Sequence, residues 1–174
     1  MTDLTALRVP RRVVVARDDV ALAVPTDGDL ATLAAAGDGP FEVDHDERPL
    51  PFTPPSGRLV VIADGRLAGD VGWIPMPNGP TYPCLAWDIG IDLLPAARGR
   101  GIGRLAQRLL AEYLFASTDL DRVQASTDVE NIAEQRALEA AGFRREGVLR
   151  GAQLRGGLRR DIVMYGLLRA DLTQ

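Results

Sequence analysis

The stretch RGRGIG, residues 98–103, decides the fold, because it separates two apolar segments of different periodicity. Before it, CLAWDIGIDLLP (84–95) alternates apolar and polar residues, which is typical of a half-buried strand. After it, IGRLAQRLLAEYLF (102–115) repeats apolar residues at three- and four-residue spacing, which predicts an amphipathic helix. Glycines at a helix start let other atoms approach the backbone, so this turn is a candidate ligand site.

Outward from this turn, the chain is predicted to alternate strands and helices. Upstream we expect a hairpin over 11–25, a helix over 26–36, a long loop over 38–57, a second hairpin over 58–74 and a loop over 75–83. Downstream we expect a strand over 122–127, a helix over 131–143 and closing strands over 143–150 and 160–168. The unit 84–127 predicts a right-handed parallel crossover in a mixed α/β sheet.

Composition limits the classes of function that are open to the chain. Its 174 residues are 46% hydrophobic, which favours one packed domain over 1–174. A net charge of −4 favours neither a nucleic-acid partner nor a membrane surface. All 20 basic residues are arginines, which excludes a P-loop lysine and Schiff-base chemistry. One Cys and one His make a zinc site improbable, and no signal peptide or long apolar run is visible, so we expect a cytoplasmic protein without a metal.

Three interpretations of the glycine turn compete. A dinucleotide-binding fingerprint needs a third glycine where Arg104 stands, and a tight turn without any ligand is also open. The third interpretation is an anion site. A helix that begins at Gly101 offers unpaired N–H groups and the positive end of its dipole, and Arg98, Arg100 and Arg104 add charge. The cluster of arginines around the turn favours the anion site.

The pattern Arg98-x-x-Gly101-x-Gly103 resembles the pyrophosphate loop of the GCN5-related N-acetyltransferase (GNAT) family. The preceding DIGIDLLPAARGRG is similar to the family's fourth strand and its run into the loop. NIAEQRALEAAGFRREGVLR and RDIVMYGLL resemble its Asn-led helix and its last strands. The likeness is strongest over 85–168 and looks closest to the branch that acetylates the N-termini of ribosomal proteins.

The resemblance implies a fold, a donor and a set of binding residues. It implies a single-domain, mostly antiparallel mixed sheet with flanking helices, in which the family's fourth and fifth strands splay apart around the thioester of acetyl-CoA. The residues that would hold the coenzyme are Ile91, Asp92, Leu93, Arg98, Gly99, Arg100, Gly101, Ile102, Gly103, Arg104 and Asn131. The reaction would be direct attack of an amine on the thioester, without a metal.

Two carboxylates are candidates for proton transfer. Asp88 stands where many relatives have a Glu, so the resemblance makes it a candidate base; alternatively, it only occupies the wet side of a half-buried strand. A Tyr acid is common four residues before the Gly-Phe pair, but here that residue is Leu138. Glu134, where relatives often have Ser, is either a catalytic group or the N3 partner of Asn131 in a capping box, and the spacing favours the cap.

The acceptor amine is not identified by the sequence. The acidic segment around Asp44 and His45 could bind a cationic amine, and a protein N-terminus or a small-molecule amine would each suit the site. Two alternatives keep the fold: a module that binds acyl-CoA without catalysis, and a transferase that uses a different acyl donor. The oligomeric state, a homodimer included, is left open.

Overall fold

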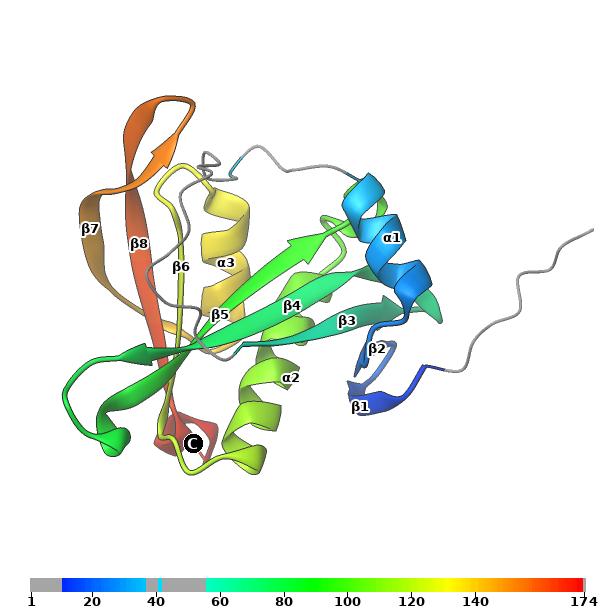
Figure 1. Ribbon diagram of the computed structural model, residues 1–174, viewed down its shortest axis with the longest axis horizontal. Helices are drawn as coiled ribbons and strands as arrows, with labels where there is room; N and C mark the ends of the chain where they lie inside the picture. Colours follow the sequence, from blue (N-terminus) through cyan, green and yellow to red (C-terminus); the bar gives the residue numbers. More distant parts are fainter. Residues whose placement is uncertain (1–10, 37–40, 42–55, 174) are drawn as a thin grey trace, which may run out of the picture.

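The computed structural model describes residues 11–36, 41 and 56–173. Most of the predicted loop 38–57, with Asp44 and His45, lies outside the described residues. The strands are β1 (Val13–Arg17), β2 (Val20–Ala23), β3 (Gly57–Ala63), β4 (Arg66–Pro77), β5 (Leu85–Leu93), β6 (Arg122–Asp128), β7 (Arg144–Arg155) and β8 (Leu158–Leu168). The α-helices are α1 (Asp27–Ala35), α2 (Ile102–Ser117) and α3 (Ile132–Ala140), with 3₁₀ turns at Tyr82–Cys84, Pro95–Ala97 and Arg169–Thr173 (Figure 1).

The strands form one mixed, mostly antiparallel sheet in the order β1-β2-β3-β4-β5-β6-β8-β7. The pair β5–β6 is parallel, and every other pair of neighbours is antiparallel. The helix α2 connects β5 to β6, as a parallel pair requires. The predicted α/β class and the mixed sheet are therefore confirmed.

The sheet divides between β5 and β6. Only three residue pairs join these two strands, namely Trp87 with Val123, Asp88 with Gln124 and Ile89 with Ala125. Beyond them β5 stays paired with β4 to Leu93, and β6 stays paired with β8 to Asp128. Beyond these three pairs the facing edges of β5 and β6 are not paired with each other, and Figure 1 shows the two strands diverging. We call this unpaired region the opening between β5 and β6.

One hydrophobic core packs α2 and α3 on one face of the sheet. It joins Val71 of β4, Ile89 of β5 and Ala125 of β6 to Leu110 of α2 and Leu138 of α3. Successive strand residues point to opposite faces, so the neighbours of these residues face away from α2 and α3. On β5, β6 and β8 that opposite face carries Asp88, Gln124, Ser126, Asp128 and Arg160.

The element bounds differ from the sequence predictions in two places. The segment 75–77, predicted as loop, continues β4 and pairs with residues 85–87 of β5. The closing hairpin is longer than predicted, because β7 extends to Arg155 and β8 begins at Leu158. The register of the β7–β8 ladder shifts between Leu149 and Gln153, and residues 153–155 then pair with β8 again. Because the segment 150–155 is mostly polar, the alternation of apolar residues does not predict this part of the strand.

Candidate active site

The glycine turn places an uncapped helix end beside the opening between β5 and β6. Gly101, the N-cap of α2, adopts φ 77°, a left-handed conformation that favours glycine, and none of the side chains that the structure describes caps the helix. A Cβ on Gly99 or Gly101 would meet nothing within 4 Å. The other two α-helices have capped first turns that contain acidic residues, whereas the first turn of α2 has neither. The free N–H groups of α2 therefore face open space and favour an anion.

The three arginines around this turn differ in their contacts. The Nε of Arg98 donates to the carbonyl of Leu93 at 2.9 Å, and so ties the turn to the end of β5. Arg100 forms an ion pair with Asp64 of the β3–β4 turn at 2.6 Å, with both side chains about half exposed. Arg104 is exposed in the first turn of α2 and forms no ion pair with the residues described. Arg104 is thus the most available of the three for a phosphate.

Asp88 belongs to the middle one of the three residue pairs that join β5 and β6, on the face away from α2 and α3. Its Oδ1 is buried and has no hydrogen-bond partner among the described residues. Burial raises the pKa of Asp88 to about 6, and a hydrogen bond from Gln124 opposes the shift. Asp88 is therefore a half-buried carboxyl with a raised pKa, which suits a group that accepts a proton. Its role as a base stays a prediction.

Gln124 connects Asp88 to a polar network that sequence patterns do not reveal. The residue is 4% exposed and stands opposite Asp88 in the parallel ladder. Its Oε1 accepts from Arg122 Nε at 3.3 Å and from Asn78 Nδ2 at 3.5 Å, which leaves its amide N–H groups for Asp88. Arg122 in turn binds Glu146 through two hydrogen bonds of 2.6 and 2.8 Å. The contacts to the Gln124 oxygen fix the orientation of its side-chain amide, so that the N–H groups are directed to Asp88.

Glu134 forms only half of the predicted capping box. The Asn131 side chain accepts from the backbone N–H of Glu134 at 3.3 Å, but the N–H of Asn131 donates to the carbonyl of Asp128 instead of to the Glu134 carboxylate. The half-buried carboxyl lies beside the buried Gln107 side chain of α2. Burial raises its pKa to about 7, with the charge of Asp92 acting in the same direction and the Gln107 hydrogen bond acting against it. Glu134 is therefore a second half-buried carboxyl whose pKa is raised to near neutrality.

The remaining predicted binding residues line the opening in different ways. Past the last pair with β6, the strand β5 presents Gly90, Ile91, Asp92 and Leu93 along an edge that no strand covers. Ile102 is buried in the core, so only its backbone is available at the turn. Gly103 lies under Leu93, since a Cβ there would meet that side chain at 3.5 Å. The turn, the β5 edge and the N-terminus of α3 thus border one opening.

Within residues 11–36, 41 and 56–173, no group of three or more His, Cys, Asp or Glu side chains is arranged to hold a metal ion. No helix in the same part of the chain has the length and apolar character needed to cross a membrane.

Comparison with known proteins agrees with this geometry. The family model for the acetyltransferase (GNAT) domain matches residues 46–144. "Probable N-acetyltransferase YjcK" of Bacillus subtilis is 32% identical over 116 residues, which cover 67% of this chain and 62% of that protein. The chain spans less than two thirds of the length of the curated relatives it matches.

Solved structures share the fold at low sequence identity. Mycobacterium smegmatis RimJ, solved in complex with a CoA-disulfide, aligns with a TM-score of 0.73 and 19% identity over 95% of this chain and 88% of that one. Spermidine N-acetyltransferase from Vibrio cholerae, solved with CoA and spermine, aligns with a TM-score of 0.73 and 18% identity over 91% of this chain and all of that one. These likenesses confirm the predicted architecture of the sheet and helices.

Proposed function

The chain belongs to the acetyltransferase (GNAT) family, and from that premise we propose that it transfers an acetyl group from acetyl-CoA to a primary amine. The observation that carries the proposal is the opening between β5 and β6, bordered by the uncapped N-terminus of α2. The family resemblance assigns the diphosphate to the turn 98–104 and the pantetheine arm to the β5 edge. CoA in the solved structures of RimJ and spermidine N-acetyltransferase supports this donor.

The two half-buried carboxyls, Asp88 and Glu134, divide the proton transfers between them. The amine nitrogen attacks the thioester carbon, and Asp88, which is ionised above about pH 6, accepts the proton that the nitrogen loses. The carbon–sulfur bond then breaks, and Glu134, which holds its proton up to about pH 7, donates it to the departing thiolate. Asp88 faces away from α2 and α3, whereas Glu134 is on α3. We therefore place the attacking amine on the face of Asp88 and the departing sulfur on the side of α3.

Backbone and helix groups supply the electrostatic part of the mechanism. An N–H on the open edge of β5 at residues 91–93 would polarise the thioester carbonyl and stabilise its oxyanion. The N–H groups at 101–104 and the Arg104 guanidinium would bind the diphosphate. A thiol leaves readily, so a neighbouring acid of pKa about 7 is sufficient.

The proposal is tested by coupling a thiol-release assay to a panel of amines. Acetyl-CoA is incubated with the protein and with spermine, spermidine or short peptides that carry a free amino terminus. We expect at least one amine to release CoA in equal amount to the acetylated product, and Asp88→Asn to reduce kcat by about 100-fold or more. Calorimetry with CoA runs in parallel. Tight CoA binding without thiol release for any amine would favour the non-catalytic binding module instead.

A further inference from the structure

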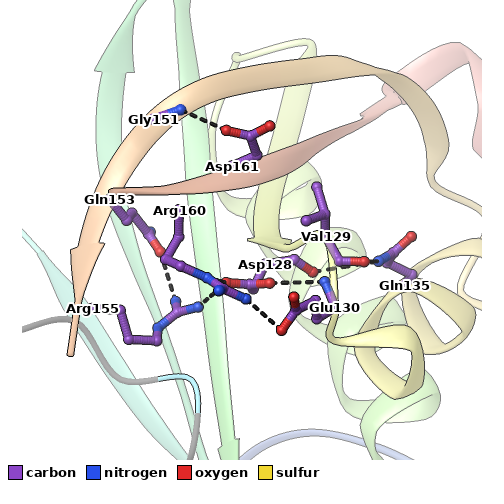
Figure 2. Close-up of polar contacts among 9 residues, drawn as sticks. All are labelled: Asp128, Val129, Glu130, Gln135, Gly151, Gln153, Arg155, Arg160 and Asp161. Carbon is purple, nitrogen blue, oxygen red and sulfur yellow. Dashed lines mark hydrogen bonds and ion pairs between the residues drawn. The ribbon is translucent and has the colours of Figure 1, made fainter. Parts of the chain in front are cut away.

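We propose that Asp128 positions the β7–β8 hairpin beside the acceptor amine; the proposal rests on the acetyl transfer proposed above. We use the name Asp128 clamp for Asp128, Arg155 and Arg160. Asp128 is the last residue of β6, and its side chain is 0% exposed. It accepts hydrogen bonds from Arg155 of β7 and from Arg160 Nε of β8, the latter at 3.3 Å (Figure 2). Two strands of the hairpin are therefore held by one carboxylate.

The carboxylate remains charged despite its burial. Burial alone would raise the pKa of Asp128, but the backbone N–H of Glu130, 2.8 Å away, and the charges of Arg160 and Arg155 hold it below its ordinary value. A buried, ionised carboxylate that loses its partners is costly, so the three side chains hold one geometry. The arginines have further partners, because Arg155 donates to Gln153 at 2.8 Å and Arg160 pairs with Glu130.

The clamp joins the hairpin to the segment that leads into α3. Beyond Asp128, Gln135 of α3 donates to the carbonyls of Asp128 and Val129 at 3.3 and 2.9 Å. The N–H of Val129 donates to the carbonyl of Asp161 on β8 at 3.2 Å. Within the hairpin, the Asp161 carboxylate accepts from the N–H of Gly151 at 2.7 Å, as Figure 2 shows. Hairpin, β6 terminus and α3 N-terminus therefore form one hydrogen-bonded unit.

The position of the clamp points to the acceptor and not to the coenzyme. Asp128 lies on the same face of β6 as Gln124, the partner of Asp88, and this face is turned away from α2 and α3. The clamp thus borders the side from which the amine reaches the proposed base. Arg155 also stacks on Phe41, with its guanidinium carbon 5.6 Å from the ring centroid, so the clamp fixes a further side chain on this side.

The test separates the clamp from a general loss of stability. Asp128→Asn keeps an oxygen for the Glu130 N–H but removes the charge that both arginines meet. The matched control is Asp171→Asn at the other end of the strands. Asp171 is 13% exposed in its side chain and pairs with Arg144 of β7 at 2.8 Å and with the Leu168 N–H at 3.0 Å. Each variant thus removes the charge of one carboxylate that holds β7.

Kinetics use whichever amine of the panel, a peptide with a free amino terminus or spermine, the wild-type protein acetylates fastest. For Asp128→Asn we expect the acceptor KM to rise about tenfold, while kcat at saturating acceptor and the Kd for CoA change by less than about twofold. Asp171→Asn should leave all three unchanged. Arg155→Gln, which leaves the Glu130 contact intact, should reproduce the KM effect, and the double variant should raise KM no further. An unchanged acceptor KM in Asp128→Asn and Arg155→Gln overturns the proposal.

Hydrogen exchange gives an answer that does not depend on activity. The backbone amides of residues 151–160 should exchange about tenfold faster or more in Asp128→Asn than in the wild-type protein. If Asp128→Asn does not fold, Arg155→Gln takes its place. In Asp171→Asn the same amides should exchange at the wild-type rate. Unaltered exchange in the clamp variants overturns the proposal even if the wild-type protein is active. If the wild-type protein acetylates no amine, the proposed function fails, and exchange alone then decides whether the clamp holds the hairpin.

Discussion

The carboxyl of Asp88, the proposed base, lowers the stability of the folded protein at neutral and alkaline pH. A carboxyl whose pKa is about 6 in the folded protein, against 3.8 in the unfolded chain, binds its proton more tightly when folded. Relative to its effect at alkaline pH, this group therefore favours the folded state fully below about pH 4. That contribution to stability is lost as the pH rises from about 4 through 6. A shift of this size corresponds to roughly 2–3 kcal/mol above pH 7.

Replacement of Asp88 by Asn should therefore stabilise the protein while it slows the transfer. We expect Asp88→Asn to raise the free energy of unfolding by roughly 2 kcal/mol at pH 8 and by almost nothing at pH 4, because the buried charge is then absent from both proteins. Urea denaturation of wild type and variant at the two pH values checks the difference. An equal effect at both pH values would show that the charge of Asp88 is not the cause.

Gln124 should set the pH at which the reaction begins. Its hydrogen bond lowers the pKa of Asp88, so Gln124→Leu should raise that pKa above 6 and move the acidic limb of kcat/KM to higher pH. Asn78→Ala is the control, since it removes a contact to the Gln124 oxygen and leaves the contact to Asp88. The pH dependence of kcat/KM, measured between pH 5 and 9, tests this prediction. An acidic limb that does not shift in Gln124→Leu would contradict the role of the amide.

At the scale of the element, the start of α2 allows binding and backbone strain to be separated. Gly101→Ala forces a Cβ into a left-handed conformation at φ 77° and into the space proposed for the diphosphate. Gly157 at the hairpin turn has φ 72° and equally open surroundings. Both substitutions should cost about 1 kcal/mol of stability. Only Gly101→Ala should weaken CoA binding, by about tenfold or more in calorimetry, whereas an equal loss in Gly157→Ala would refute the placement of the diphosphate.

Local patterns predicted the elements, and contacts between distant residues explain what they missed. The glycine turn, the alternation over 84–94 and the cap Asn131 each depend on neighbours within a few positions, and each is found where expected. Glu134 was assigned to a cap by spacing, yet tertiary burial against Gln107 decides its environment. Asp128 carries no local signal, because its arginine partners lie 27 and 32 residues further along the chain.

At the scale of the whole molecule, ligand binding should stabilise the fold by mass action. A ligand present at 100 times its Kd adds about 2.7 kcal/mol, which corresponds to an increase in Tm of about 5–10 °C for a chain of this length. We expect this increase with CoA in a thermal melt. Pantetheine, which lacks the diphosphate, should give a much smaller increase at equal concentration. Equal increases with the two ligands would assign the binding energy to the β5 edge and not to the α2 turn.

The length of the β5–β6 ladder also limits the size of the acyl group. Each residue pair added to or removed from a ladder shifts its end by about 3.3 Å, roughly the length of a two-carbon unit. Three pairs hold the two parts of the sheet together along these strands. If the acyl group lies against the end of this ladder, as the proposed function implies, a donor with a longer acyl chain would need a shorter ladder. We therefore expect the number of β5–β6 pairs to be one determinant of the acyl length that the site accepts.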